Sequence, residues 1–253
     1  MVDAGARALF SREALVALPA LTPAARIADA MRFALRPTPY AARHPWDVTL
    51  LAALVVMLAL NLAMNGAAIG LLEALDKATG LLPPPLPETR TPGTMALSAV
   101  IFAPVLEEAL HRGWMNGRIA ALRFAAFGFA ATACLLAGLA LPEQGQKLAL
   151  LLAVLIALTG LAQWLHTRAR DTGVPQWFTR HFALLVWGGS LIFAAIHLGA
   201  YAPLAHPLGV LVVTPQLIGG VLLCYVRTRL GLRAAMLHHA AYNAVMLALE
   251  ARV

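Results

Sequence analysis

Seven runs of predominantly apolar residues constrain this chain more than any other feature of its sequence. They cover roughly residues 48–70, 94–116, 121–141, 147–165, 182–201, 207–226 and 233–250. A helix of about 20 apolar residues matches the hydrocarbon thickness of a bilayer. Only 12% of the residues are charged, about half the usage of soluble domains. The sequence therefore predicts an all-α, polytopic membrane bundle of about seven transmembrane helices.

A single bundle accounts for residues 47–253, because helices of about 20 residues with short loops leave no room for a second folded unit. Residues 1–46 are predicted to be a basic N-terminal segment without a cleavable signal peptide, since charges interrupt any apolar run near its start. Within it, Thr22 and Pro23 are typical of a helix start, and the next residues combine an apolar face with arginines. This pattern favours a helix on the cytoplasmic membrane surface over a disordered tail.

The basic residues distinguish the two sides of the predicted membrane protein. Leaving out Arg112, one side has fourteen: Arg7, Arg12, Arg26, Arg32, Arg36, Arg43, Arg118, Arg123, Arg168, Arg170, Arg180, Arg227, Arg229 and Arg233. The other side has four: Lys77, Arg90, Lys147 and Arg252. The positive-inside rule then predicts that the N-terminus is in the cytoplasm and the C-terminus outside. The richness in alanine, leucine and arginine favours a bacterial protein, so a bacterial cytoplasmic membrane is the expected location. Because the net charge of +7 is dispersed between apolar segments, nucleic acid is not an expected partner.

Three groups of strongly polar residues interrupt the apolar runs. They are Glu107, Glu108 and Arg112 in the second run, His197 in the fifth, and His238, His239 and Asn243 in the seventh. At the bilayer centre each charge costs about 2.5 to 3.5 kcal/mol, so ionisable residues at such depth are usually functional. Separate helices of one bundle can bring the three groups together.

Two pairs of polar residues have the spacing at which helical side chains meet. Glu108 and Arg112 are four residues apart, so Arg112 can neutralise Glu108 and leave Glu107 as the less compensated carboxylate. A hydrated helix end at the cytoplasmic interface is the alternative explanation of these charges. Asn61 and Asn65, also four apart, are assigned to hydrogen bonding between helices.

The histidines have partners at the same spacing. His239 and Asn243 share one helix face, whereas His238 is turned away by about 100°. Phe193 lies four residues before His197, so its ring can pack against the imidazole and fix its orientation. Alternatively, each of these residues could serve only in packing or in ordinary interhelical hydrogen bonds.

Taken together, the patterns Glu107-Glu108-x-x-x-Arg112, Phe193-x-x-x-His197 and His239-x-x-x-Asn243 resemble the three motifs of the CPBP (Abi-type) family, named for CAAX proteases and bacteriocin-processing enzymes. The segments APVLEEALHRG and LIGGVLLCYVRTRLGLRAAMLHHAAYN are similar to the family around its first and third motifs. The resemblance covers roughly residues 94–250. Two predicted spans, 121–141 and 147–165, separate the first motif from the second and are an insertion relative to many family members.

The resemblance implies an intramembrane endopeptidase that hydrolyses a peptide bond of a membrane-associated or lipidated substrate, CAAX-type processing included. By this resemblance Glu107 is the general base that activates water, and His197 holds or polarises that water. His239 and Asn243 stabilise the oxyanion of the tetrahedral intermediate. The implied catalytic set is Glu107, Glu108, Arg112, His197, His239 and Asn243.

The sequence leaves the role of a metal open. Glu107, His197 and His239 make a zinc-ligand set with an open position for water, and the family is often labelled metalloprotease. Its members have also been argued to use glutamate and histidine alone. No HExxH, GxSxG or intramembrane aspartate pair is present, and Cys134 and Cys224 lack the spacing of a metal or disulfide motif.

Two functions of other classes stay open at this stage. One is a non-catalytic membrane partner of the same fold, such as an immunity protein, and the other is an ion-coupled transporter whose Glu and His relay protons. The depth of His197 is a further question, because counting about 1.5 Å per residue along a straight helix puts it nearer the outer face than Glu107 and His239. A tilted helix or a break at Gly188 and Gly189 would lower it, and a different start of the helix would also change the count.

Overall fold

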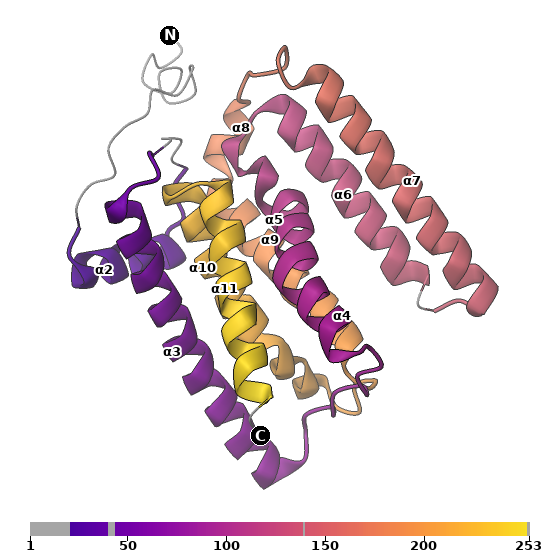
Figure 1. Cartoon of the computed structure of the whole chain (residues 1–253). Coiled ribbons are helices and arrows are strands. Elements are labelled where there is room, and N and C mark those ends of the chain that lie inside the picture. Colours follow the sequence, from indigo (N-terminus) through magenta and orange to yellow (C-terminus); the bar gives the residue numbers. More distant parts are fainter. Residues whose placement is uncertain (1–20, 40–43, 139, 252–253) are drawn as a thin grey trace.

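The computed structural model describes residues 21–39, 44–138 and 140–251, which form helices joined by short loops (Figure 1). The elements in chain order are α2 (Pro23–Leu35), α3 (Val48–Thr79), α4 (Pro92–Leu97), η1 (Ser98–Phe102), α5 (Ala103–Arg112), η2 (Gly113–Asn116), α6 (Ile119–Gly138), α7 (Glu143–Thr167), α8 (Gln176–Arg180), α9 (Phe182–Ile196), η3 (His197–Ala200), η4 (Pro207–Val213), α10 (Thr214–Arg229) and α11 (Leu232–Glu250). These described residues include no strand, only an isolated bridge between Pro85 and Tyr201. The all-α prediction is confirmed.

Six helical segments of the described chain are long and apolar enough to cross a membrane. They are Val48–Thr79, Pro92–Asn116, Ile119–Gly138, Glu143–Thr167, Phe182–Ala200 and Pro207–Arg229. The outward-facing surface of α7 shows why lipid is needed, since Leu150, Leu151 and Leu158 are each more than half exposed. Burying such side chains in a bilayer is favourable, whereas water would penalise them. The chain is therefore an integral membrane protein.

The prediction of seven spans is corrected to six. Residues 233–250 do form a helix, α11, which has 19 residues and packs against α3, α5 and α10. Its mean hydropathy is lowered by Arg233, by the two histidines and by Asn243, so it does not qualify as a span on composition. The same polar residues make α11 the most informative helix for function.

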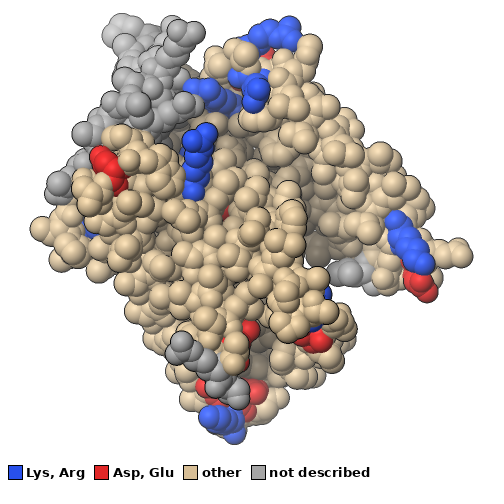
Figure 2. Space-filling model, in the orientation of Figure 1, with Lys and Arg blue, Asp and Glu red and all other residues tan. Residues whose placement is uncertain are grey.

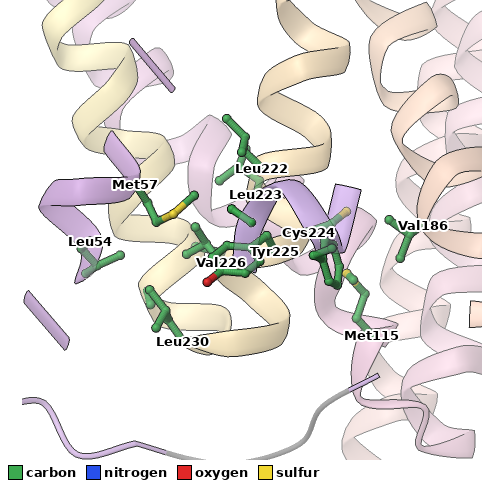
Figure 3. Close-up of a cluster of buried hydrophobic side chains, with 14 of the residues drawn as sticks. Leu54, Met57, Met115, Val186, Leu222, Leu223, Cys224, Tyr225, Val226 and Leu230 are labelled. Atoms are coloured by element: carbon green, nitrogen blue, oxygen red, sulfur yellow. The ribbon is translucent and has the colours of Figure 1, made fainter. Parts of the chain in front are cut away.

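Helix α10 is the centre of the bundle. It packs against α2, α3, α9 and α11, and most of its residues from Gly220 onward are buried. Figure 3 shows its side chains between Leu54 and Met57 of α3 on one side and Met115 and Val186 on the other. The buried cluster on α10 is made by Leu222, Leu223, Cys224, Tyr225 and Val226. This packing fixes α10 as the scaffold against which the polar helices are placed.

The N-terminal helix α2 begins as predicted. Thr22 caps it by accepting a hydrogen bond from the backbone N–H of Ala25, and Pro23 occupies its first turn. The helix packs on α3 and α10 through Ala30 and Phe33, and Arg26 is also buried there instead of lying on an exposed polar face. The predicted residues 1–20 of this segment lie outside the described residues.

Helix α3 is longer than the predicted span. Its 32 residues extend about 48 Å, well beyond the roughly 30 Å hydrocarbon core of a bilayer. Gly80 ends the helix in the left-handed conformation, and the proline-rich segment after it is not helical. That segment pairs with the loop after η3, because Leu86 N–H donates to Ala200 and Ala202 N–H donates to Pro84. The two loops together cover this end of the bundle.

The spans predicted over residues 121–141 and 147–165 form a helical hairpin at the edge of the bundle. Helices α6 and α7 run side by side, and α6 alone makes extensive contacts with α5 and η2 (Figure 1). Close approach is permitted by glycines, since a Cβ on Gly160 would lie 2.5 Å from the Cβ of Phe127. The hairpin therefore lies on one side of the bundle, and it leaves α10 packed against α3, α9 and α11, and α11 packed against α3 and α5.

Candidate functional site

The first motif lies where the second span changes its helical geometry. Residues Ser98–Phe102 form the π-helical turn η1, and α5 then carries Glu107 and Glu108. Pro104 explains the change, because it has no backbone N–H and its ring would clash with a regular α-helical carbonyl. Within η1, Ala103 N–H donates to Ser98 instead of to Ala99. The carbonyl of Ala99 is thereby left for a donor from outside the helix.

Glu108 and Arg112 form the predicted ion pair in the interior of the bundle. Their side chains are 0% and 1% exposed, and Arg112 Nη1 bonds directly to Glu108 Oε1. The guanidinium also donates to the Gly220 carbonyl at 3.4 Å and lies 4.5 Å over the ring of Phe193. A buried charge is tolerated only when it is paired and hydrogen-bonded in this way. The pair fixes α5 against α10 and α9.

His239 is held between the two glutamates of α5. Its Nδ1 lies 3.0 Å from Glu108 Oε1, and its Nε2 lies 3.9 Å from Glu107 Oε2. Because a carboxylate oxygen accepts, Nδ1 is assigned the proton, which leaves Nε2 facing Glu107. Glu107 Oε2 is buried and has no hydrogen-bond partner among the described residues. Glu107 is thus the less compensated carboxylate, as predicted.

His197 lies immediately after the end of α9. Its Nδ1 donates to the Phe193 carbonyl at 2.8 Å, and the ring centroids of the two residues are 4.8 Å apart. The predicted contact with Phe193 is confirmed, with the backbone carbonyl as an additional anchor. The donor role of Nδ1 leaves Nε2 of His197 as the free ring nitrogen.

Of the explanations left open for the depth of His197, a break at Gly188 and Gly189 is not observed, because α9 is continuous through both glycines. Arg180, from which the depth was counted, lies on the separate short helix α8, and His181 separates the two helices. A count along one straight helix therefore does not give the depth of His197.

Asn243 supplies the donor that Ala99 lacks. Its Nδ2 donates to the Ala99 carbonyl at 2.8 Å, so α11 and η1 are joined next to the site. One N–H of the amide remains for another acceptor.

One cavity brings the predicted residues together. It has a volume of about 210 Å³, and Glu107, His197, His239 and Asn243 all contribute to its wall. The four residues come from α5, η3 and α11, which are far apart in the chain. Glu108 and Arg112 are not among the residues that line the cavity. Glu108 accepts a hydrogen bond from His239, and Arg112 pairs with Glu108. All six residues singled out from the sequence therefore belong to one constellation.

A hydrogen-bonded chain of three side chains runs beside this cavity. Asn65 Nδ2 donates to Asn61 Oδ1 at 2.7 Å, and Asn61 Nδ2 lies 3.1 Å from His238 Nε2. This chain joins α3 to α11, in line with the packing role assigned to the asparagines. Asn61 also lines the cavity, which the sequence did not indicate. His238, turned away from His239, contributes to the packing side.

Two further polar residues of the cavity were missed. Gln216 and Tyr242 both line it. Gln216 lies in the first turn of α10 without any spacing relation to the motifs, so only the fold could identify it. Tyr242 precedes Asn243 directly, but its aromatic character is typical of many helix surfaces.

The zinc set proposed from the sequence can be compared with the geometry. Among the described residues, no three His, Cys, Asp or Glu side chains form a group that could hold a metal ion. Glu107, His197 and His239 share the cavity without reaching a three-ligand arrangement. Zinc dependence stays a prediction. Cys134 and Cys224 are both free thiols.

Comparisons with protein families, with curated proteins and with solved structures find no match for this chain. The residues of the cavity and their geometry are therefore the basis for assigning a function.

Proposed function

We propose that the protein is an intramembrane endopeptidase of CPBP type, which hydrolyses a peptide bond of a membrane-associated substrate. The observation that carries the proposal is the shared cavity. An uncompensated carboxylate, two imidazoles and an amide from three distant segments meet around a space of about 210 Å³ inside a bundle of apolar helices. That space is large enough for water and one peptide group.

Glu107 has the environment of a general base. Its Oε2 is buried, unpartnered among the described residues and directed to the side where His239 Nε2 lies. In the proposed step this carboxylate takes a proton from water as the water oxygen attacks the peptide carbonyl carbon. The same proton is then given to the leaving amine nitrogen, so that one water is consumed and a carboxylic acid and an amine are formed.

The two imidazoles complete the water and oxyanion sites. His197, anchored through Nδ1, offers Nε2 as an acceptor that orients the attacking water. His239 can donate to the oxyanion when Nε2 also carries a proton, and the Glu108 carboxylate on Nδ1 then compensates the positive charge. The second N–H of Asn243 is the other oxyanion donor. Fixed donors of this kind are typically the largest electrostatic contribution to acyl transfer.

The first test of protease activity is made in cells, because the cleavage products found there identify the substrate. Membrane peptides are compared between cells that have the parent chain, the isosteric variant Glu107→Gln, His239→Gln and the control Glu143→Gln, whose carboxylate lies on the exposed start of α7. The proposal expects new peptide termini that require the parent chain or the control and are absent with both site variants. Hydrolysis in ¹⁸O-labelled water should add one labelled oxygen to the new carboxyl terminus.

Two results would replace the proposal with the other functions considered. Identical peptide termini in all four strains, together with a phenotype that survives both site variants, would indicate a non-catalytic partner. Proton-coupled flux in proteoliposomes that is lost with Glu107→Gln, without any peptide cleavage, would indicate a transporter.

A further inference from the structure

A second, larger cavity adjoins the candidate site. We propose that it is the vestibule through which an extended polypeptide segment reaches the site from the arginine-poor end of the bundle, and that Gln216 holds the substrate backbone at the junction. The inference builds on the proposed protease function, because it names the route and the kind of substrate for that site.

The vestibule has a volume of about 850 Å³ and is built by the far ends of α3 and α11, the proline-rich loop and the first turn of α10. Its volume lies in the range of about 300 to 1,000 Å³ that is usual for ligand sites. Four residues line both spaces: Pro215, Gln216, Tyr242 and Asn243. The two cavities therefore meet at a wall made by α10 and α11, and Asn243 faces both.

The direction of the vestibule follows from positions along α11. Met246 and Glu250 line it and lie seven and eleven residues beyond His239, which is about 10 and 16 Å along the helix. The arginine-rich loops are at the other end, where α10 finishes with Arg227 and Arg229. Figure 2 shows several Lys and Arg side chains toward the upper end of the molecule, and acidic side chains together with basic ones at the lower tip. The site thus opens away from the arginine-rich end.

The residues that line the vestibule indicate that it is filled with water and not with lipid. Glu73, Asp76 and Glu250 contribute carboxylates to its outer part. Carboxylates facing hydrocarbon would cost several kcal/mol each, so a cavity that contains three of them is hydrated. An aqueous chamber favours a polypeptide substrate over a lipid tail as the group that occupies it.

Gln216 has the chemistry needed at the junction. Its Oε1 is buried and has no hydrogen-bond partner among the described residues. A primary amide offers both a donor and an acceptor, which matches the alternating C=O and N–H groups of an extended peptide backbone. Pro215 precedes Gln216 in the first turn of α10, and its fixed backbone angle favours the helical conformation from which the Gln216 side chain extends. With the predicted orientation, the substrate is a segment exposed on the extracytoplasmic side, such as part of an exported protein, and not a cytosolic prenylated tail.

Cysteine labelling in cells tests the route without requiring catalysis. Met246→Cys is placed in the vestibule and Thr172→Cys in the arginine-rich loop before α8, each with Cys134→Ala so that only the buried Cys224 remains as a native thiol. A membrane-impermeant maleimide is applied to intact cells and to disrupted membranes. We expect Met246→Cys to be modified in intact cells and Thr172→Cys only after disruption.

The labelling result is decisive in either direction. Modification of Met246→Cys only after disruption, or in neither sample, would overturn the route. Repeating the labelling with Glu107→Gln keeps it independent of hydrolysis, so that a failed protease proposal and a failed route give different results.

Kinetics with a cleaved peptide tests the role of Gln216. Gln216→Leu removes the amide and keeps a side chain of similar size. Loss of one hydrogen bond to the substrate should raise KM about tenfold and leave kcat little changed. Gln146→Leu, on the exposed start of α7, is the matched control and should leave both constants unchanged. An unchanged KM in Gln216→Leu, or a loss in kcat alone, would contradict the assignment.

Discussion

Asn243 of α11 donates its amide to the backbone carbonyl of Ala99, 2.8 Å away on a different helix. In a regular helix this carbonyl would accept from Ala103, but Ala103 donates to Ser98 in the π-helical turn. The next residue, Pro104, has no N–H to offer. A side chain at the candidate site thus satisfies a carbonyl that the proline leaves unpaired. Asn243 therefore links the backbone geometry of η1 to the position of a proposed oxyanion donor.

This relationship predicts a rescue experiment. Asn243→Ala should lower the free energy of unfolding by about 1 to 3 kcal/mol, because the partly buried Ala99 carbonyl loses its donor. Pro104→Ala restores a backbone N–H, so the double variant should be destabilised less than the sum of the single variants. Unfolding in detergent micelles measures the four proteins as a double-mutant cycle. Additive effects would contradict the relationship, and cleavage should stay low in the rescued protein because the amide is still missing.

Removing the charge of Arg112 should destabilise the bundle strongly. Arg112→Met leaves the buried Glu108 without its cationic partner and with only the His239 imidazole, among the described residues, as a hydrogen-bond donor. Removing one member of a buried ion pair typically costs about 3 to 5 kcal/mol. Lys147→Met breaks an ion pair of the same spacing, with Glu143, that is largely exposed, and should cost no more than about 1 kcal/mol. The free energies of unfolding of both variants are measured in detergent micelles and compared. Equal losses would show that the interior pair is not specially required.

The stability of the α6–α7 hairpin should depend on its close packing, and a change within the hairpin should leave the candidate site intact. Gly160→Leu must displace Phe127, whose Cβ would lie 2.5 Å from the new Cβ, and should cost about 1 to 3 kcal/mol. Gly66→Leu on α3 meets nothing within 4 Å and serves as the control. Molecules of Gly160→Leu that remain folded should still cleave substrate. Loss of cleavage without loss of stability would instead connect the hairpin to the site.

The predicted architecture followed from patterns that are local in the chain. The lengths of the apolar runs predict the positions of the helices, and the i,i+4 spacing predicts the Glu108–Arg112 pair that the structure contains. Residues 233–250 are predicted as a span because their apolar residues outnumber their polar ones. The polar residues nevertheless keep the mean hydropathy of this helix below that of a membrane span. His238 and His239 are buried in the bundle, and His239 and Asn243 line the cavity. Of the three, only His239 and Asn243 are predicted as site residues from the sequence, through their i,i+4 spacing and their resemblance to the third motif.

Other features depend on tertiary structure and have no local signal. Gln216 becomes a cavity residue only because the first turn of α10 lies beside α11. Arg26 looked like part of an exposed basic face, but packing on α10 buries it. The depth of His197 could not be counted correctly, because the turn at His181 between α8 and α9 is not visible in a hydropathy pattern.

Chelation distinguishes the two forms of water activation left open by the sequence. If Glu107 and the histidines act without metal, cleavage by purified protein should persist in 1,10-phenanthroline after dialysis against EDTA. Metal content of the purified protein is measured in the same samples. Activity that disappears with the chelator and returns with Zn²⁺ would show that the ligands assemble around zinc in the working enzyme.

The most direct measurement is the cleavage rate of purified Glu107→Gln in proteoliposomes, with a membrane peptide identified from cells. Because Gln preserves shape but cannot accept the proton, kcat should fall by about 10² to 10⁴, while Glu143→Gln cleaves at the parental rate. Cleavage by Glu107→Gln at the parental rate would contradict the central claim that this carboxylate activates the water.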